Sequence, residues 1–276
     1  MSAPKVPRDH FSGIAPKWSD WGPPLRPSPD DCAVFQRVVS TLNAGASAVV
    51  LGLTPEIIEC DWPADIRLTA VDHSRAMFDA LWPAKNGPAN ARAVLGDWCS
   101  MPIPSASIDL VAGDGCFVLL DFPDAYAALT REVRRVLRPG GRFVIRVFLR
   151  PDRSETIADI ALALAKGEIG SAHALKLRLL AAVHGASGHG SRLDDAWQAW
   201  SGMSTHLPER CFGVRGWTPG EIGGIEWYRG MDARYYLPTL AELREAMHDG
   251  FTEVECAWGR HELADRCPTL VFAAGV

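Results

Sequence analysis

Short apolar runs recur along the first half of the chain, and most are followed by a glycine or an aspartate. A run of this length bounded by turn residues is typical of a strand buried in a parallel sheet. Segments with helical periodicity separate the runs at intervals of roughly 20 to 30 residues, as in βαβ units. The pattern predicts an α/β fold with a doubly wound, mostly parallel sheet. The predicted strands span 48–51, 67–71, 91–95, 107–112 and 142–149.

Three segments do not follow this alternation. Residues 1–30 are rich in proline and glycine and carry two tryptophans, which predicts an N-terminal arm over the site. Residues 151–230 contain helical stretches, and we expect a helical insertion that forms a lid on the acceptor side. Two late strands, expected to pair as an antiparallel hairpin at one sheet edge, follow a helix near residue 240. The core would comprise 31–150 and 231–276.

Four of the predicted strands end at a glycine, an aspartate or a Gly-Asp pair, and Gly52, Asp72, Asp97 and Asp114 fall at these ends. Right-handed crossovers place the carboxyl ends of parallel strands on one edge of the sheet. Ligands of doubly wound sheets bind beyond that edge. We therefore expect a ligand site there.

The segment LTREVRRVLRPGGRFVIRV, residues 129–147, reads as a helix, a turn and a strand. Together with the order of the other elements, it resembles class I methyltransferases, over 45–150 and more loosely over 237–276. The resemblance implies a seven-stranded type of sheet, S-adenosylmethionine as cofactor and S-adenosylhomocysteine as product. In the first loop only Gly52 matches a motif glycine, and Val50 stands where the family usually has an acid.

The resemblance implies that residues at the strand ends bind the methyl donor. Asp72 would accept hydrogen bonds from both ribose hydroxyls, or would only cap the next helix. Glu56 would accept the donor's ammonium, or would only favour a helix N-terminus. Asp97 would accept from the adenine amino group with Trp98 over the ring, or would only form a turn. The predicted donor-binding residues are Gly52, Thr54, Glu56, Asp72, His73, Ser74, Gly96, Asp97, Trp98, Asp114, Cys116 and Phe117.

Cys116 and Phe117 would either contact the donor or only pack in the core.

Methyl transfer depends on alignment and desolvation, so no obligatory catalytic side chain is expected. If the acceptor is a hydroxyl, Asp114 and His206 are candidate bases. The insertion mixes aromatic and polar residues as small-molecule pockets do, although it could also be a cap that contacts no ligand. The acceptor-side candidates are Trp18, Trp21, His206, Arg210, Arg215, Trp227 and Tyr228.

Composition narrows the choice of partners. A net charge of −5 argues against nucleic acid, because binding phosphates needs a basic face. Seven cysteines without a C-x-x-C pair predict reduced thiols and no metal site. We expect no secretory signal, no membrane span and a cytoplasmic location.

The predicted function is therefore methyl transfer to a small-molecule acceptor. Two alternatives stay open: a catalytically silent donor-binding regulatory or scaffold protein, and a nucleotide-dependent oxidoreductase. The first is favoured by the missing motif glycines. The second is weakened because the first loop lacks G-x-G-x-x-G.

Overall fold

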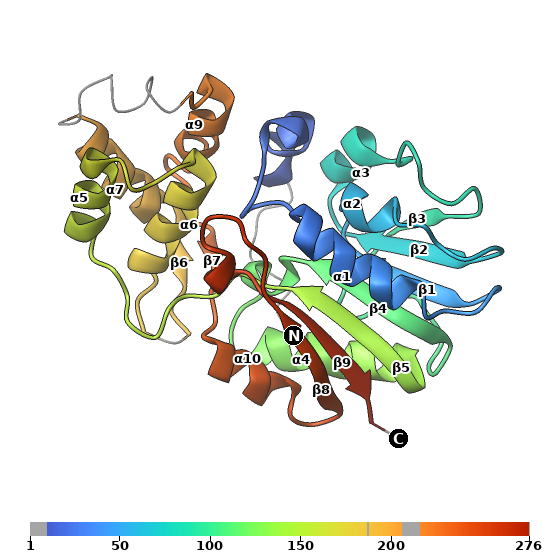
Figure 1. Ribbon diagram of the computed structural model, residues 1–276. Helices are drawn as coiled ribbons and strands as arrows, with labels where there is room; N and C mark the ends of the chain where they lie inside the picture. The colour runs from blue at the N-terminus through green and yellow to red at the C-terminus, as the bar shows by residue number, and fades with distance from the viewer. Residues whose placement is uncertain (1–9, 187, 206–215, 276) are drawn as a thin grey trace.

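Seven strands form one sheet in the order β3-β2-β1-β4-β5-β9-β8 (Figure 1). The computed structural model describes residues 10–186, 188–205 and 216–275. The first five strands pair in parallel, and β9 and β8 add an antiparallel edge. The strands are β1 Ser47–Leu51, β2 Arg67–Asp72, β3 Arg92–Leu95, β4 Ile108–Asp114, β5 Leu137–Arg146, β8 Phe251–Ala257 and β9 Thr269–Ala274. The predicted fold class and the late hairpin are confirmed.

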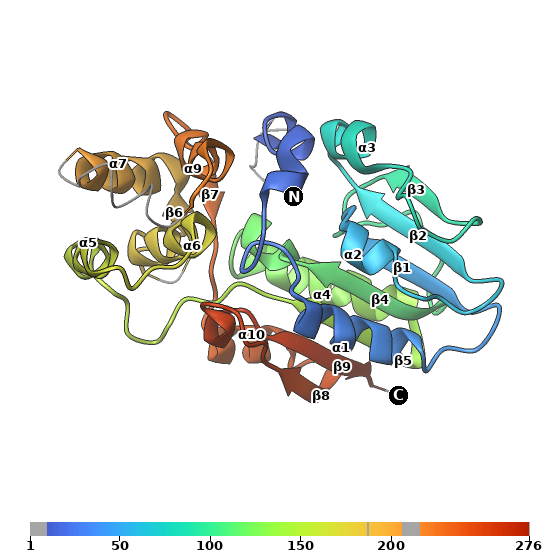
Figure 2. The same cartoon turned by 45° about the horizontal axis from the view of Figure 1, so that its top comes forward.

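Helices cover both faces of the sheet, which explains why β1 is apolar at every position after Ser47 (Figure 2). Ala48 and Val50 pack towards α1, α2 and α3, whereas Val49 and Leu51 pack in the other core cluster with α4 and α10. These helices are α1 Pro29–Val39, α2 Pro55–Ile58, α3 Arg75–Leu81, α4 Asp124–Val136 and α10 Leu240–Met247. Ser28 caps α1 as predicted.

The bounds of β5 differ most from the prediction, which placed this strand at 142–149. The stretch 138–141, predicted as a turn before the strand, lies inside β5, where the register with β4 shifts between Ile108 and Leu110. Helix α3 ends at Leu81, because the residue before Pro83 is disfavoured in helical geometry.

The insertion has a hydrophobic core of its own, built largely from its helices. Its described elements are α5 Ile157–Lys166, α6 Ala172–Ala182, β6 Ser191–Arg192, α7 Leu193–Ser204, α9 Pro219–Glu226 and β7 Arg234–Tyr235. Among the described residues, no helix is long and apolar enough to cross a membrane.

The arm lies between the insertion and the α3 side of the core (Figures 1 and 2). It contains two short 3-10 helices, η1 His10–Ser12 and η2 Ala15–Asp20, in a segment that the sequence predicted as neither helix nor strand. The arm therefore contacts both the core and the insertion.

Two further short 3-10 helices lie elsewhere in the chain: η3 Cys116–Leu119 follows β4, and η4 Ala264–Arg266 precedes β9.

Candidate functional site

Gly52 and Asp72 meet at the carboxyl ends of two neighbouring strands. Gly52 has a φ of +89°, a left-handed conformation that glycine adopts without strain, and its amide donates to Val71 O at 2.8 Å. A Cβ at Gly52 would lie 3.8 Å from Asp72 Oδ2 and 3.8 Å from Trp98 Cζ2. The glycine thus keeps the backbone open beside a carboxylate and an indole.

The Asp72 carboxylate is fixed in place by the backbone after it. The side chain is buried, and Oδ1 accepts a hydrogen bond from the Ser74 amide at 2.7 Å. Burial raises the pKa of Asp72, while the Ser74 amide and His73 oppose this shift. Ser74, whose hydroxyl accepts from the Met77 amide, is the N-cap of α3. The alternative of Asp72 as that cap is therefore wrong.

Glu56 pairs with an arginine from the arm. Arg26 Nε and Nη2 lie 2.7 and 2.6 Å from Glu56 Oε1. Arg26 Nη1 also donates to the carbonyl oxygens of Trp18 and Trp21 at 3.0 and 3.3 Å. Glu56 Oε2 is buried and has no hydrogen-bond partner among the described residues. Thr54 precedes α2 as its N-cap residue, but its hydroxyl makes no capping hydrogen bond.

Asp114, the last residue of β4, forms a buried ion pair. Arg146, fully buried at the end of β5, donates from Nε to Asp114 Oδ1 at 2.7 Å and from Nη1 to Pro24 O at 2.7 Å. Burial raises the pKa of Asp114, and the Arg146 charge opposes that shift. The candidate base is thus engaged by a guanidinium that also holds the arm.

Of the predicted donor-binding residues after β4 and β3, some are buried in the core and one is exposed. Cys116 and Phe117 are buried in the core, where Phe117 lies 4.7 Å from the Tyr126 ring, so their side chains match the packing alternative. Gly96 and Asp97 follow β3, and the exposed Asp97 accepts from the Cys99 amide at 2.9 Å in a turn.

Trp98 is buried beside Gly52. Its indole nitrogen donates to Val71 O at 2.6 Å, and its ring meets the His73 ring edge-on at 6.1 Å. His73 also contacts the Phe11 ring of the arm at 6.0 Å. The arm thus touches the residue that follows Asp72.

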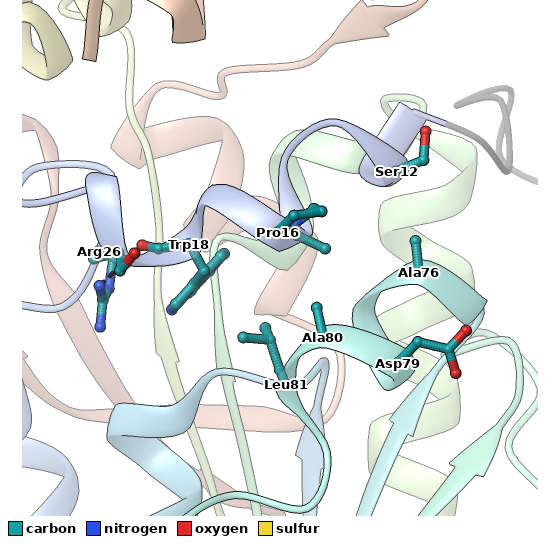
Figure 3. Close-up of a pocket in the computed structure, with 10 residues that line it drawn as sticks. Ser12, Pro16, Trp18, Arg26, Ala76, Asp79, Ala80 and Leu81 are labelled. Atoms are coloured by element: carbon teal, nitrogen blue, oxygen red, sulfur yellow. Dashed lines mark hydrogen bonds between the residues drawn. The ribbon is translucent and has the colours of Figure 1, made fainter. Parts of the chain in front are cut away.

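A cavity of about 690 Å³ separates the arm from α3 (Figure 3). Pro16 and Trp18 approach it from the arm, and Ala76 and Ala80 from α3. Small-molecule pockets measure about 300–1,000 Å³. The lining residues are Ser12, Ala15, Pro16, Trp18, Ser19, Arg26, Ala76, Asp79, Ala80 and Leu81. Arg26 connects this cavity to Glu56.

Residues 51–145, which carry Gly52, Asp72, Asp97 and Asp114, match a family model described as a methyltransferase domain. This part of the chain is therefore a methyltransferase domain, and its strands belong to the seven-stranded sheet. A search of the curated proteins found no match.

Solved structures similar to this methyltransferase share its fold at low identity. The N-methyltransferase NodS from Bradyrhizobium japonicum WM9, in complex with S-adenosyl-l-homocysteine, is 11% identical with a TM-score of 0.52, covering 97% of this chain and 98% of that one. The 1,6-didemethyltoxoflavin-N1-methyltransferase from Burkholderia thailandensis is 14% identical with a TM-score of 0.52, covering 100% and 92%. A putative Zn-dependent alcohol dehydrogenase from Rhodobacter sphaeroides is 15% identical with a TM-score of 0.62, covering 100% of both chains. At these identities the similarity extends to the fold alone.

Three of the acceptor-side candidates, Trp21, Trp227 and Tyr228, lie where the arm meets the insertion, whereas Trp18 lines the cavity beside α3. The Trp21 ring stacks on His173 at 6.3 Å, and Tyr228 is buried nearby. Trp227 is partly exposed and packs so closely on Gly13 that a Cβ there would lie 2.2 Å from its ring. His206, Arg210 and Arg215 lie outside the described residues.

Sequence reasoning missed Arg26, Arg146 and Lys176. Arg146 and Lys176 each stand within a mostly apolar segment, FVIRVFL and ALKLRLLAA, and that interruption was a usable signal. Arg26 has no comparable signal, because it precedes α1 in a proline-rich stretch and its partner lies 30 residues away.

Proposed function

We propose that this methyltransferase transfers a methyl group from S-adenosylmethionine to a small-molecule acceptor. The donor would lie beyond the ends of β1, β2 and β4. The observation that carries this proposal is the buried Asp72 carboxylate beside Gly52, which has no side chain to fill the adjoining space. An ionised carboxylate accepts two hydrogen bonds and so suits a ribose diol. Asp97, exposed at the end of β3, would accept from the adenine amino group.

The amino-acid end of the donor would bind the pair Arg26 and Glu56. This end is a zwitterion, and the pair offers one group of each charge. The donor's ammonium would bind Glu56 Oε2, which has no hydrogen-bond partner among the described residues, and its carboxylate would bind Arg26. The arm would thus replace part of the family's glycine-rich loop.

Chemistry at the methyl group requires alignment more than side-chain participation. S-adenosylmethionine supplies an electrophilic sulfonium methyl, and the acceptor attacks it in line with the leaving sulfur. The protein would orient the donor at both ends and exclude water by covering the site with the arm and insertion. Arg146 would hold the arm down through Pro24 O.

A small acceptor agrees with the surroundings of the site. The arm lies between the insertion and the core (Figures 1 and 2), so an acceptor beside the donor would be bordered by three segments of the chain. A net charge of −5 gives no general attraction for a nucleic-acid acceptor.

Calorimetry with two ligands tests the zwitterion contact. S-adenosylhomocysteine carries the amino-acid end, whereas 5′-methylthioadenosine lacks it. We expect Arg26→Gln and Glu56→Gln to weaken S-adenosylhomocysteine by about 1.5–3 kcal/mol and to leave 5′-methylthioadenosine unchanged, because only the former loses charged hydrogen bonds. Arg244→Gln, in an exposed pair with Glu253, is the matched control. Equal losses for both ligands, or none, would refute the assignment.

A further inference from the structure

Lys176 is a buried amine at the boundary between the insertion and the arm. It lies on α6 with 3% of its surface exposed. Its Nζ is buried and has no hydrogen-bond partner among the described residues. The nitrogen lies 4.0 Å from the Trp21 ring centre and 4.3 Å from that of Tyr228. Trp21 belongs to the arm, so the arm forms one side of the enclosure around the amine.

Two features of the environment act on the protonation of Lys176 in opposite directions. Burial lowers the pKa of Lys176 well below its ordinary value of 10.5, which favours the neutral amine relative to an exposed lysine. Aromatic ring faces attract cations, most strongly when the cation is desolvated. The two rings would therefore stabilise an ammonium once a proton arrives. A group that accepts a proton during a reaction and releases it afterwards needs both properties.

Neighbouring titratable groups have other partners. His173, one turn earlier on α6, lies 3.6 Å from Glu221, and burial lowers the pKa of His173. Tyr228 and Tyr235 meet ring to ring at 6.0 Å. Lys176 differs from these neighbours because its amine has no hydrogen-bond partner among the described residues.

The arm links this amine to the proposed donor site. Trp21, whose ring covers Lys176, accepts through its carbonyl oxygen a hydrogen bond from Arg26, the partner of Glu56. A single residue of the arm thus contacts the groups on both sides.

We infer that Lys176 is the general base of methyl transfer and that the acceptor is a small molecule with an acidic O–H or N–H group. This inference rests on the proposed function. The acceptor would reach the amine from the boundary between the arm and α6. Its proton passes from oxygen or nitrogen to Lys176 Nζ, and the freed electron pair forms the new bond to the methyl carbon. The bond from that carbon to sulfur breaks with its electrons left on sulfur, and the ammonium later returns the proton to water.

Nitrophenols test the inference without knowledge of the natural acceptor, because their phenolate forms absorb visible light. The three isomers of nitrophenol are titrated into full-length protein, with and without S-adenosylhomocysteine, at a pH below their own pKa. We expect the wild type and Lys166→Met, which removes an exposed lysine of α5, to increase the phenolate fraction of at least one isomer. Lys176→Met should abolish the increase. Absence of a signal for all isomers in the wild type, or its persistence in Lys176→Met, overturns the inference.

Turnover gives a second readout that a structural role would not produce. With an acceptor that the wild type methylates, Lys176→Met should lower kcat by about 10²–10⁴-fold at unchanged KM for the donor. Lys176→Arg should fail to restore kcat, because a guanidinium retains its proton. Full activity in either variant refutes the base. Failure of the wild type to bind S-adenosylhomocysteine would instead refute the proposed function, while the nitrophenol result without that ligand would still decide the role of Lys176.

Discussion

Three buried or half-buried basic side chains lie in the arm or against it, and each has a different electrostatic environment. Arg146 has the Asp114 carboxylate, Arg26 has Glu56, and the Lys176 nitrogen lies over the Trp21 and Tyr228 rings. A paired buried charge recovers part of its desolvation cost through its partner. Burial of Lys176 instead lowers its pKa, which links folding to pH.

Lys176→Met should change how stability depends on pH. The folded pKa of Lys176 is lowered, so unfolding takes up a proton wherever the pH lies between that value and 10.5. Across this window the wild type's free energy of unfolding should rise with pH, relative to the variant, by about 1.4 kcal/mol per pH unit. Urea unfolding at several pH values measures both slopes. Parallel curves for wild type and Lys176→Met would show that the amine stays charged.

At the scale of elements, we expect donor binding to affect the arm most. Its contacts with the core include the pair of Arg26 with Glu56 and the bond from Arg146 to Pro24 O. Because the donor's amino-acid end would add a ligand to Arg26, donor binding should stabilise the docked arm.

Limited trypsin digestion tests this coupling at Lys17, which is exposed in η2. We expect S-adenosylhomocysteine to slow cleavage after Lys17, and 5′-methylthioadenosine to leave the rate nearly unchanged. Cleavage after Lys85, in the exposed loop beyond α3, should proceed equally in all samples and serves as the internal control. Equal protection by both ligands would mean that the amino-acid end does not engage the arm.

The burial and pairing of each strand explain how well it could be predicted from the sequence. Strands β1, β2 and β4 were predicted well because burial on both faces makes them continuous apolar runs between turn residues. Strand β5 was predicted to begin too late, since an irregular pairing with β4 keeps 138–141 in the strand despite its turn-like composition.

The candidate site was predictable only where its residues belong to a local sequence pattern. The Gly52 and Asp72 positions follow directly from strand ends. Contacts such as Arg146 with Pro24, which are 122 residues apart, depend on tertiary folding and leave no local pattern.

For the whole molecule, the family match covers the donor half of the proposed site and the added segments supply the rest. Residues 51–145 contain Gly52 and Asp72, whereas Arg26 and Lys176 come from the arm and the insertion. The insertion has its own hydrophobic core, so it can hold Lys176 rigidly against the arm. We therefore expect substitution of Asp72 to weaken donor binding, and substitution of Lys176 to impair acceptor chemistry without weakening donor binding.

Calorimetric titration of wild type and Asp72→Ala with S-adenosylmethionine tests the central claim most directly. Asp72 is buried beside Gly52, and its carboxylate is oriented by the Ser74 amide. We predict saturable binding to the wild type, and binding to Asp72→Ala weaker by about 1–3 kcal/mol, because hydrogen bonds to a charged group are lost. Circular dichroism of the variant checks that it is folded. No binding to the wild type, or wild-type affinity in folded Asp72→Ala, would contradict the donor site described here.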